Sequence, residues 1–193
     1  KEAFWAEQAA LIDWATPFTR VLDHANPPFA YWYPDATLNL CHNTVDRHLA
    51  ERSEQNALIW VSTEVEKTVE ITYRTLYEQV NQAAAVFMEM GVTRGDRMLI
   101  YMPMIPQAVV AMLACVRIGA IHSVVFGGFA ADALASRIND AAPKLIVTAD
   151  VGMRGGKVID YTPLLNAAFE QITIAKPKVL IVHRGLVPDA SVD

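Results

Sequence analysis

From residue 98 onward the chain alternates short apolar runs with helical patterns, and this alternation limits the possible folds more than any other feature. The short runs predict strands, and the segments between them predict helices because their apolar residues recur at helical spacing. We expect strands at Met98–Tyr101, Ile121–Val125, Leu145–Thr148 and Val179–Val182, and helices at Pro106–Ile118, Ala130–Ala141 and Tyr161–Gln171. This order predicts an α/β fold with a doubly wound, mostly parallel sheet flanked by helices.

The residues before 98 follow other patterns. The first half-hundred are aromatic-rich and broken by prolines, which predicts an irregular arm that lays aromatic anchors on another surface. The remaining expectations are a helix at Phe4–Trp14, a helix capped by Asn43, strands at Ala57–Ser62 and Val69–Tyr73, and an amphipathic helix over Tyr73–Phe87 that ends near Gly91. Strand Ile121–Val125 does not alternate, so we expect it to be covered on both faces. A loop is expected for Leu186–Asp193.

Composition excludes several classes of protein. Sixteen basic and 21 acidic residues give a net charge of −5, which argues against a nucleic-acid binder. The apolar stretch Leu99–Val116 contains Pro103 and Pro106, so it is interpreted as a buried strand and helix and no membrane span is expected. Two distant cysteines, of which Cys115 lies in an apolar run, indicate a reducing, cytoplasmic setting. The first residue is Lys1, which suggests that the sequence begins inside a longer protein.

Two glycine-containing segments follow predicted strands, where ligands collect in open α/β sheets. The first is Phe126–Phe129, in which Gly127 and Gly128 allow positive φ and close approach of a ligand to the backbone. Its phenylalanines are suited to wall a slender apolar chain. The alternative is a tight strand-to-helix turn with two core aromatics, and the segment by itself does not decide between them.

The second segment, Asp150–Lys157, contains two cations, Arg154 and Lys157, separated by Gly155 and Gly156. We expect a flexible basic loop in which Arg154 forks onto phosphate oxygens and Lys157 adds a point charge. The alternative is a solvated surface loop. The local basic charge in an acidic chain, close to another glycine segment, favours a phosphate site.

Other sites are not supported by the spacing. The segment is no Walker loop, because three residues rather than four separate Gly152 from Gly156 and Val158 follows Lys157. The histidines show no metal-ligand spacing, so no metal site is expected. Ser123 lacks the flanking glycines of a nucleophile elbow, although His122 is adjacent.

Several longer runs closely resemble the short-chain acyl-CoA synthetases, the acetyl- and propionyl-CoA ligases of the adenylate-forming superfamily. The resemblance covers essentially the whole chain, and three motifs look closest to the propionyl-CoA branch. The runs are Phe4–Gln8, Asp13–Trp14, Gly91–Asp96, Tyr101–Met104, Ala111–Cys115, Arg117–Phe129 and Thr148–Lys157. The propionyl-like motifs are His24–Ala30, Asn39–Asn43 and Arg154–Lys157. The acetyl-CoA branch more often has a second Arg where Lys157 stands.

The resemblance implies an enzyme that makes an acyl-adenylate from a short-chain carboxylate and ATP with Mg²⁺, and then transfers the acyl group to coenzyme A. By position, Arg154 and Lys157 would bind the nucleotide phosphates of CoA, and Gly155 and Gly156 would give access to the backbone. Phe126, Gly127 and Gly128 would line the path of the pantetheine. Residues 1–55 would form the family's N-terminal extension, and residues 56–193 the first part of its AMP-binding domain.

The family's Ser/Thr/Gly-rich ATP phosphate loop does not occur in the sequence. The resemblance therefore implies that the catalytic residues, the acyl pocket and the adenylation lysine lie beyond Asp193, and that this piece of the enzyme is inactive without the remainder of its own chain. Two other hypotheses are a CoA- or nucleotide-binding module without catalysis and a scaffold domain that uses the aromatic arm.

Overall fold

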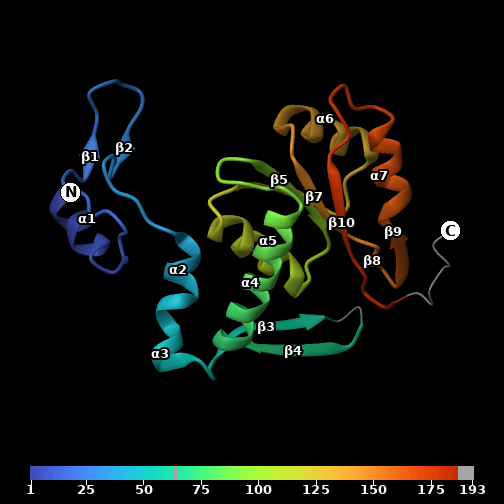
Figure 1. The fold of residues 1–193 in the computed structure, drawn as a ribbon, viewed down its shortest axis with the longest axis horizontal. Coiled ribbons are helices and arrows are strands. Elements are labelled where there is room, and N and C mark those ends of the chain that lie inside the picture. Colours follow the sequence, from blue (N-terminus) through green and yellow to red (C-terminus); the bar gives the residue numbers. More distant parts are fainter. Residues whose placement is uncertain (63–64, 187–193) are drawn as a thin grey trace.

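A four-stranded parallel sheet forms the centre of the molecule, with the strand order β10–β7–β5–β6 (Figure 1). Its strands are β5 (Arg97–Met102), β6 (Ile121–Phe126), β7 (Leu145–Ala149) and β10 (Lys178–Val182). The computed structural model describes residues 1–62 and 65–186. The loop expected for 186–193 lies outside these residues except for Leu186.

Helices cover both faces of this sheet. They are α4 (Tyr73–Glu89), α5 (Pro106–Arg117), α6 (Ala131–Ala141) and α7 (Tyr161–Phe169). The connection from β5 to β6 runs in one direction along the sheet, and those from β6 to β7 and from β7 to β10 run in the other. Because such crossovers are right-handed, α5 lies on one face and α6 and α7 on the other. Helix α4 packs beside α5. The expected doubly wound α/β fold is confirmed.

Local sequence signals explain the ends of the helices. The Thr72 hydroxyl caps α4 by accepting a hydrogen bond from the amide of Thr75, 3.2 Å away. Pro106 begins α5, where its missing amide hydrogen costs nothing. Gly91 and Gly119 follow α4 and α5 with φ of 93° and 74°, values that favour glycine. No helix in the described part of the chain is both long and apolar enough to cross a membrane.

The core of the sheet consists of β5 and β7. Every residue of β7 is buried, as is every residue of β5 after Arg97. The expectation that Ile121–Val125 is covered on both faces is wrong, because β6 is the edge strand and only Val125 is buried. Both cysteines are buried and free, as expected of Cys115, and burial raises the pKa of its thiol to about 11.

Two smaller antiparallel pairs accompany the sheet. Strands β3 (Asn56–Ser62) and β4 (Lys67–Thr72) form one, below the main sheet in Figure 1. The indole Nε1 of Trp60 on β3 donates to the carbonyl oxygen of Met104 at 2.7 Å. This bond ties the pair to the loop that follows β5. The second pair, β8 (Val151–Arg154) and β9 (Lys157–Asp160), belongs to the candidate site.

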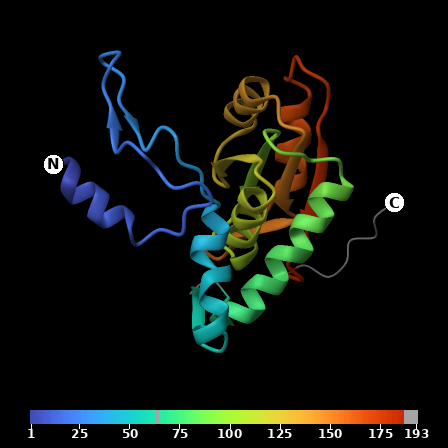
Figure 2. The same ribbon diagram turned by 60° about the vertical axis from the view of Figure 1, so that its left-hand side comes forward.

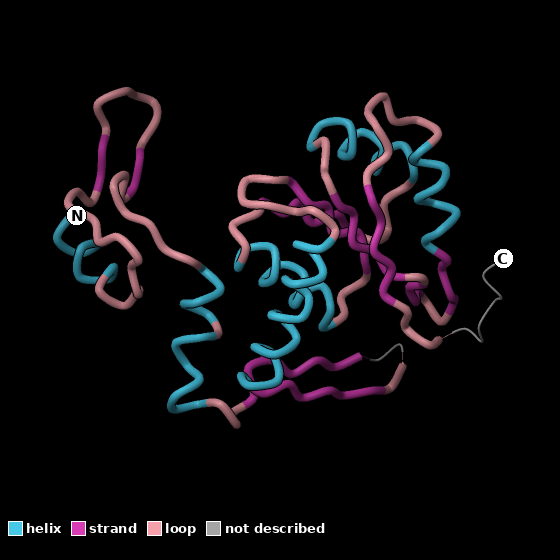
Figure 3. Tube along the Cα trace, in the orientation of Figure 1, coloured by secondary structure: helices cyan, strands magenta, loops and turns pink. Residues whose placement is uncertain are grey.

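The N-terminal arm stands apart from the sheet in two views (Figures 1 and 2). It holds helix α1 (Glu2–Ala9) and the short strands β1 (Leu22–Asp23) and β2 (Tyr31–Trp32), and loops make up most of the rest (Figure 3). The expected helix to Trp14 ends early, since the Trp14 indole folds back and donates to the Ala9 carbonyl oxygen at 2.8 Å. The rings of Trp14, Phe18 and Tyr33 pack on one another.

Asn39, and not Asn43, caps the next helix, α2 (Leu40–Thr44). Its Oδ1 accepts from the amides of Cys41 and His42, while its Nδ2 donates to the last carbonyls of α5. Asn43 lies inside α2, and its amide bonds both the N–H and the C=O of Asp13. The prediction was wrong because Asn43 holds the arm instead. The 3₁₀ helix η1 (Asp46–His48) and helix α3 (Leu49–Arg52) follow.

Arg117, at the end of α5, joins this linker to the core. Its guanidinium forms a fork with Asp46, with N–O distances of 3.0 and 2.7 Å, and also donates to Cys41 Sγ at 3.2 Å. It lies over the Tyr77 ring of α4 at 5.1 Å. Both charged side chains are about one-fifth exposed, at 20% and 22%. A pair with this geometry and burial contributes more than a surface ion pair.

The first prediction concerns this fork. Asp46→Ala is expected to lower the free energy of unfolding by about 2 kcal/mol, because it leaves a largely buried guanidinium without its carboxylate. Urea unfolding of the protein, followed by circular dichroism, measures the change.

Arg74→Ala is the matched control. It removes an ion pair with Glu54 whose side chains are 58% and 75% exposed, so its effect should be much smaller. Equal effects of the two substitutions would contradict a special contribution of the Arg117 fork.

Candidate functional site

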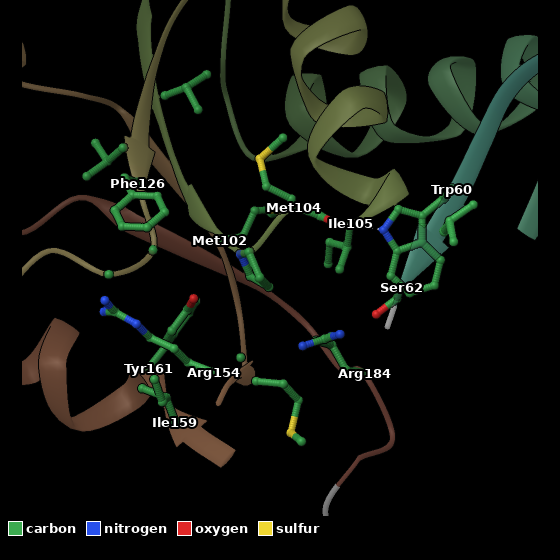
Figure 4. Close-up of a pocket in the computed structure, with 18 residues that line it drawn as sticks. Trp60, Ser62, Met102, Met104, Ile105, Phe126, Arg154, Ile159, Tyr161 and Arg184 are labelled. Carbon is green, nitrogen blue, oxygen red and sulfur yellow. Dashed lines mark hydrogen bonds between the residues drawn. The ribbon is translucent and has the colours of Figure 1, made fainter. Parts of the chain in front are cut away.

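A cavity of about 380 Å³ opens at the carboxyl ends of the parallel strands (Figure 4). Its size falls within the range of small-molecule pockets, and its position is where ligands bind in this class of fold. Five parts of the chain line it: β3, the end of β5 with the loop after it, the end of β6 with the loop after it, the β8–β9 pair with the start of α7, and Arg184, two residues after β10. The lining residues are Trp60–Ser62, Met102–Ile105, Val124–Gly128, Gly152–Arg154, Ile159, Tyr161 and Arg184.

The segment expected as a flexible basic loop is a β-hairpin. Arg154 on β8 and Lys157 on β9 are paired directly, and Gly155 and Gly156 form the two-residue turn between them. Their φ values are 57° and 74°, the positive values that the favoured hairpin turn requires at both positions. The prediction of a loop was wrong because these two glycines complete a hairpin ladder.

The cations at the hairpin tip are exposed. Arg154 lines the cavity, and Lys157 is not among the lining residues. Since cross-strand partners project from the same face, Lys157 leaves the hairpin beside Arg154. Neither side chain makes a hydrogen bond or ion pair with any residue in 1–62 or 65–186. Both charges are therefore available to a bound anion.

The two phenylalanines of the first segment have different positions. Phe126 lines the cavity and is 61% exposed, and Phe129 is 36% exposed. Their rings meet edge to face at 5.9 Å, and the guanidinium of Arg137 lies 4.4 Å from the centre of the Phe129 ring. Neither ring belongs to the hydrophobic core. The alternative prediction, a turn with two core aromatics, is therefore wrong.

The glycines between them do not adopt positive φ, contrary to the expectation. Each position holds a glycine because a side chain there would collide with a neighbouring residue. A Cβ on Gly127 would lie 2.2 Å from the Tyr161 hydroxyl oxygen, and a Cβ on Gly128 would lie 2.5 Å from the Phe126 ring. Both glycines line the cavity, as does Gly152 on β8, whose Cβ would lie 2.7 Å from the same hydroxyl.

Asp150 and Arg184 hold the base of the hairpin. The Asp150 carboxylate accepts hydrogen bonds from the amides of Val151 at 2.7 Å and of Arg184 at 3.1 Å. The Arg184 guanidinium donates to the carbonyl oxygen of Val151 at 3.2 Å. These bonds connect the first residue of β8 to the end of β10. In Figure 4 the Arg184 side chain extends into the pocket.

Sequence reasoning therefore identified Phe126, Gly127, Gly128 and Arg154 as part of one site, and the cavity brings them together. It missed Arg184 and the segment Met102–Ile105, although both follow predicted parallel strands and position alone would have found them. It also missed the β3 residues, for which there was no signal because β3 lies outside the parallel sheet.

The arrangement suits an elongated ligand with an anionic group. Apolar side chains from β3, β5 and β6 form most of the wall, and Arg154 supplies a guanidinium that can bond two phosphate oxygens at once. Phe126 and Arg154 are drawn at one end of the pocket in Figure 4 and Trp60 at the other. A ligand with its phosphate at the hairpin tip would pass Phe126 as it enters.

The chain matches two family models. The family model described as AMP-binding enzyme matches residues 45–190, and the model described as acetyl-coenzyme A synthetase N-terminus matches residues 1–44. The chain is 55% identical to a propionate–CoA ligase of Escherichia coli over 99% of its own length. It is 48% identical to an acetyl-coenzyme A synthetase of Streptomyces coelicolor over 94%. The chain spans 30% and 28% of the lengths of these two relatives.

A solved structure shows the same fold. The acetoacetyl-CoA synthetase from Streptomyces lividans superposes with a TM-score of 0.83 at 30% identity, covering 94% of this chain and 28% of that one. Because the AMP-binding model covers most of the chain, family membership does not depend on any single relative. The chain belongs to the AMP-binding enzyme family.

Proposed function

We propose that the protein containing this chain is an ATP-dependent acid–CoA ligase, which activates a short-chain carboxylate as an acyl-adenylate and transfers the acyl group to coenzyme A. The observation that carries the proposal is the cavity at the carboxyl edge of the sheet, with the Arg154 guanidinium, which has no partner among the described residues, in its wall. The relatives that match nearly the whole chain are propionate–CoA ligases and acetyl-CoA synthetases. These relatives do not favour a scaffold or a non-catalytic binding module.

We assign to CoA the cavity residues Phe126, Gly127, Gly128 and Arg154, together with Gly155, Gly156 and Lys157 beside the cavity at the hairpin tip. Arg154 and Lys157 bind its nucleotide phosphates, and the Gly155–Gly156 turn leaves the backbone between them open, with nothing within 4 Å of either glycine's missing Cβ. Phe126, Gly127 and Gly128 line the path of the pantetheine. The apolar wall and the cationic tip match a slender chain attached to a phosphorylated nucleotide.

The adenylation chemistry is assigned to the remainder of the protein. ATP, Mg²⁺ and the catalytic residues that act on the carboxylate are expected to be bound or supplied by residues beyond Asp193, because residues 1–193 contain no Ser/Thr/Gly-rich phosphate loop. Residues 1–55 then form an N-terminal extension and residues 56–193 the first part of the AMP-binding domain. Propionate is the proposed acid, since the propionate–CoA ligase is the more similar of the two relatives compared above. The proposed location is the cytoplasm.

Arg154→Ala tests the CoA assignment in the full-length enzyme. Loss of a charged phosphate contact should cost about 1.5–3 kcal/mol, which raises the KM for CoA roughly 10- to 150-fold. Carboxylate-dependent exchange of pyrophosphate into ATP should stay near normal, because that half-reaction precedes CoA binding.

Arg52→Ala serves as the charge-matched control, since Arg52 is exposed on α3 and does not line the cavity. It should leave the KM for CoA unchanged. If Arg154→Ala abolished both half-reactions together, or left the KM for CoA unchanged, the role assigned to Arg154 would be wrong.

A further prediction concerns residues 1–193 alone. A pure sample of this chain should form no acyl-CoA from acetate or propionate with ATP, Mg²⁺ and CoA, because it lacks an ATP phosphate loop. Consumption of the CoA thiol, followed chromatographically, measures the reaction, and the full-length enzyme is the positive control. Measurable turnover by the chain alone would contradict the placement of the adenylation residues beyond Asp193.

A further inference from the structure

One side chain, Tyr161, separates the two segments that the proposed function assigns to CoA. It is the first residue of α7 and only 4% exposed. A Cβ built on Gly127 would lie 2.2 Å from its hydroxyl oxygen, and a Cβ built on Gly152 would lie 2.7 Å from the same atom. Real Cβ atoms do not approach other atoms this closely. The hydroxyl therefore fills the space that two glycines, one on each segment, leave open.

The Tyr161 ring packs against the ring of Tyr101 on β5. The two rings are stacked, with centroids 5.1 Å apart and an interplanar angle of 27°. Tyr101 is fully buried, and its hydroxyl donates to the carbonyl oxygen of Phe129 at 3.1 Å. Burial, with a smaller contribution from Tyr161, raises the pKa of Tyr101 to about 12, so the hydroxyl remains a donor at ordinary pH. The Tyr101–Tyr161 pair thus lies against Gly127 and Phe129 of the Phe126–Phe129 segment.

The other segment has a fixed base. The backbone amide of Tyr161 donates to the Asp150 carbonyl oxygen at 3.0 Å, and the Asp150 carboxylate holds the amide of Val151. Asp160 caps α7 by accepting from the amide of Thr162 at 2.9 Å. β8 is anchored just before Gly152. A side chain at position 152 that collided with Tyr161 would therefore displace the part of the hairpin after Gly152, which includes Arg154.

We propose that Tyr161 is a positioning residue, whose side chain, stacked on Tyr101, sets the separation between Phe126–Gly128 and β8 and thereby places Phe126 and Arg154 around the same ligand. The proposal rests on the proposed CoA site and assigns no chemical step to Tyr161. It also explains why glycine stands at positions 127 and 152: the missing Cβ atoms point at a buried tyrosine rather than toward the ligand.

The test compares Gly127→Ala in the natural and in the Tyr161→Phe background of the full-length enzyme. A misplacement of about 1 Å can cost about 100-fold in rate, so we expect Gly127→Ala to raise the KM for CoA about tenfold or more. Pyrophosphate exchange should change little. In the Tyr161→Phe background the nearest remaining atom is the ring Cζ at 3.0 Å, and the rise should be less than about threefold. Gly152→Ala should show the same dependence on the background.

Gly128→Ala is the matched control, because its Cβ meets the Phe126 ring and not Tyr161. Its effect on the KM for CoA should be equal in both backgrounds. A Gly127→Ala penalty that Tyr161→Phe does not relieve would overturn the proposal. So would recovery of thermal stability in the double variant without recovery of the KM for CoA, because the contact would then be structural only.

Arg154→Ala, measured in parallel, distinguishes failure of the CoA assignment from failure of the positioning role of Tyr161. If it raises the KM for CoA while the glycine variants show no dependence on Tyr161, the CoA site stands and the positioning role fails. If Arg154→Ala leaves the KM unchanged, the CoA assignment itself fails, and the positioning proposal fails with it.

Discussion

The pairing of β5 with two parallel neighbours is the constraint on which the rest of the structure depends. β5 pairs with β6 over its whole length and with β7 over four residues, from Met98 to Tyr101. Parallel strands end at the same edge of a sheet, so the segments after β5, β6 and β7 must emerge together. The cavity is lined by residues of these three exits. Residues as far apart in the sequence as Met102 and Arg154 thus line the same cavity.

This construction separates the groups that hold the site from those that face its ligand. Asp150 and Arg184 bond the backbone of β8 at its base, where their charges satisfy polar groups of the chain. Arg154 and Lys157 stand at the tip with their charges uncommitted among the described residues. In a chain with a net charge of −5, two free cations on one hairpin tip create a local field that favours an anion. Arginine thus serves two purposes at this site. Arg184 bonds the backbone of β8, whereas Arg154 has no partner among the described residues.

The sequence predicted the sheet well because the signals for its elements are local. Pro106 and Gly119 mark the ends of α5, and the buried runs of β5 and β7 are too apolar to lie anywhere but inside. The wrong predictions concern features that depend on residues far away in the sequence. Asn43 has the right side chain for a helix cap, yet Asp13, thirty residues away, engages it. The exposure of β6 likewise depends on its place at the sheet edge, which strand pairing decides and composition does not.

The glycines of the site show most clearly what cannot be predicted from the sequence alone. A sequence shows only that a Cβ is missing, and three separate reasons for its absence occur here within thirty residues. Gly155 and Gly156 need positive φ and have open space around them, Gly127 and Gly152 make room for one tyrosine hydroxyl, and Gly128 makes room for its neighbour Phe126. Only the first reason is local enough to be seen in a pattern such as Arg-Gly-Gly-Lys. The second depends on the meeting of β6, β8 and α7, so the residue that explains both glycines, Tyr161, carries no sign in the sequence of its connection to either.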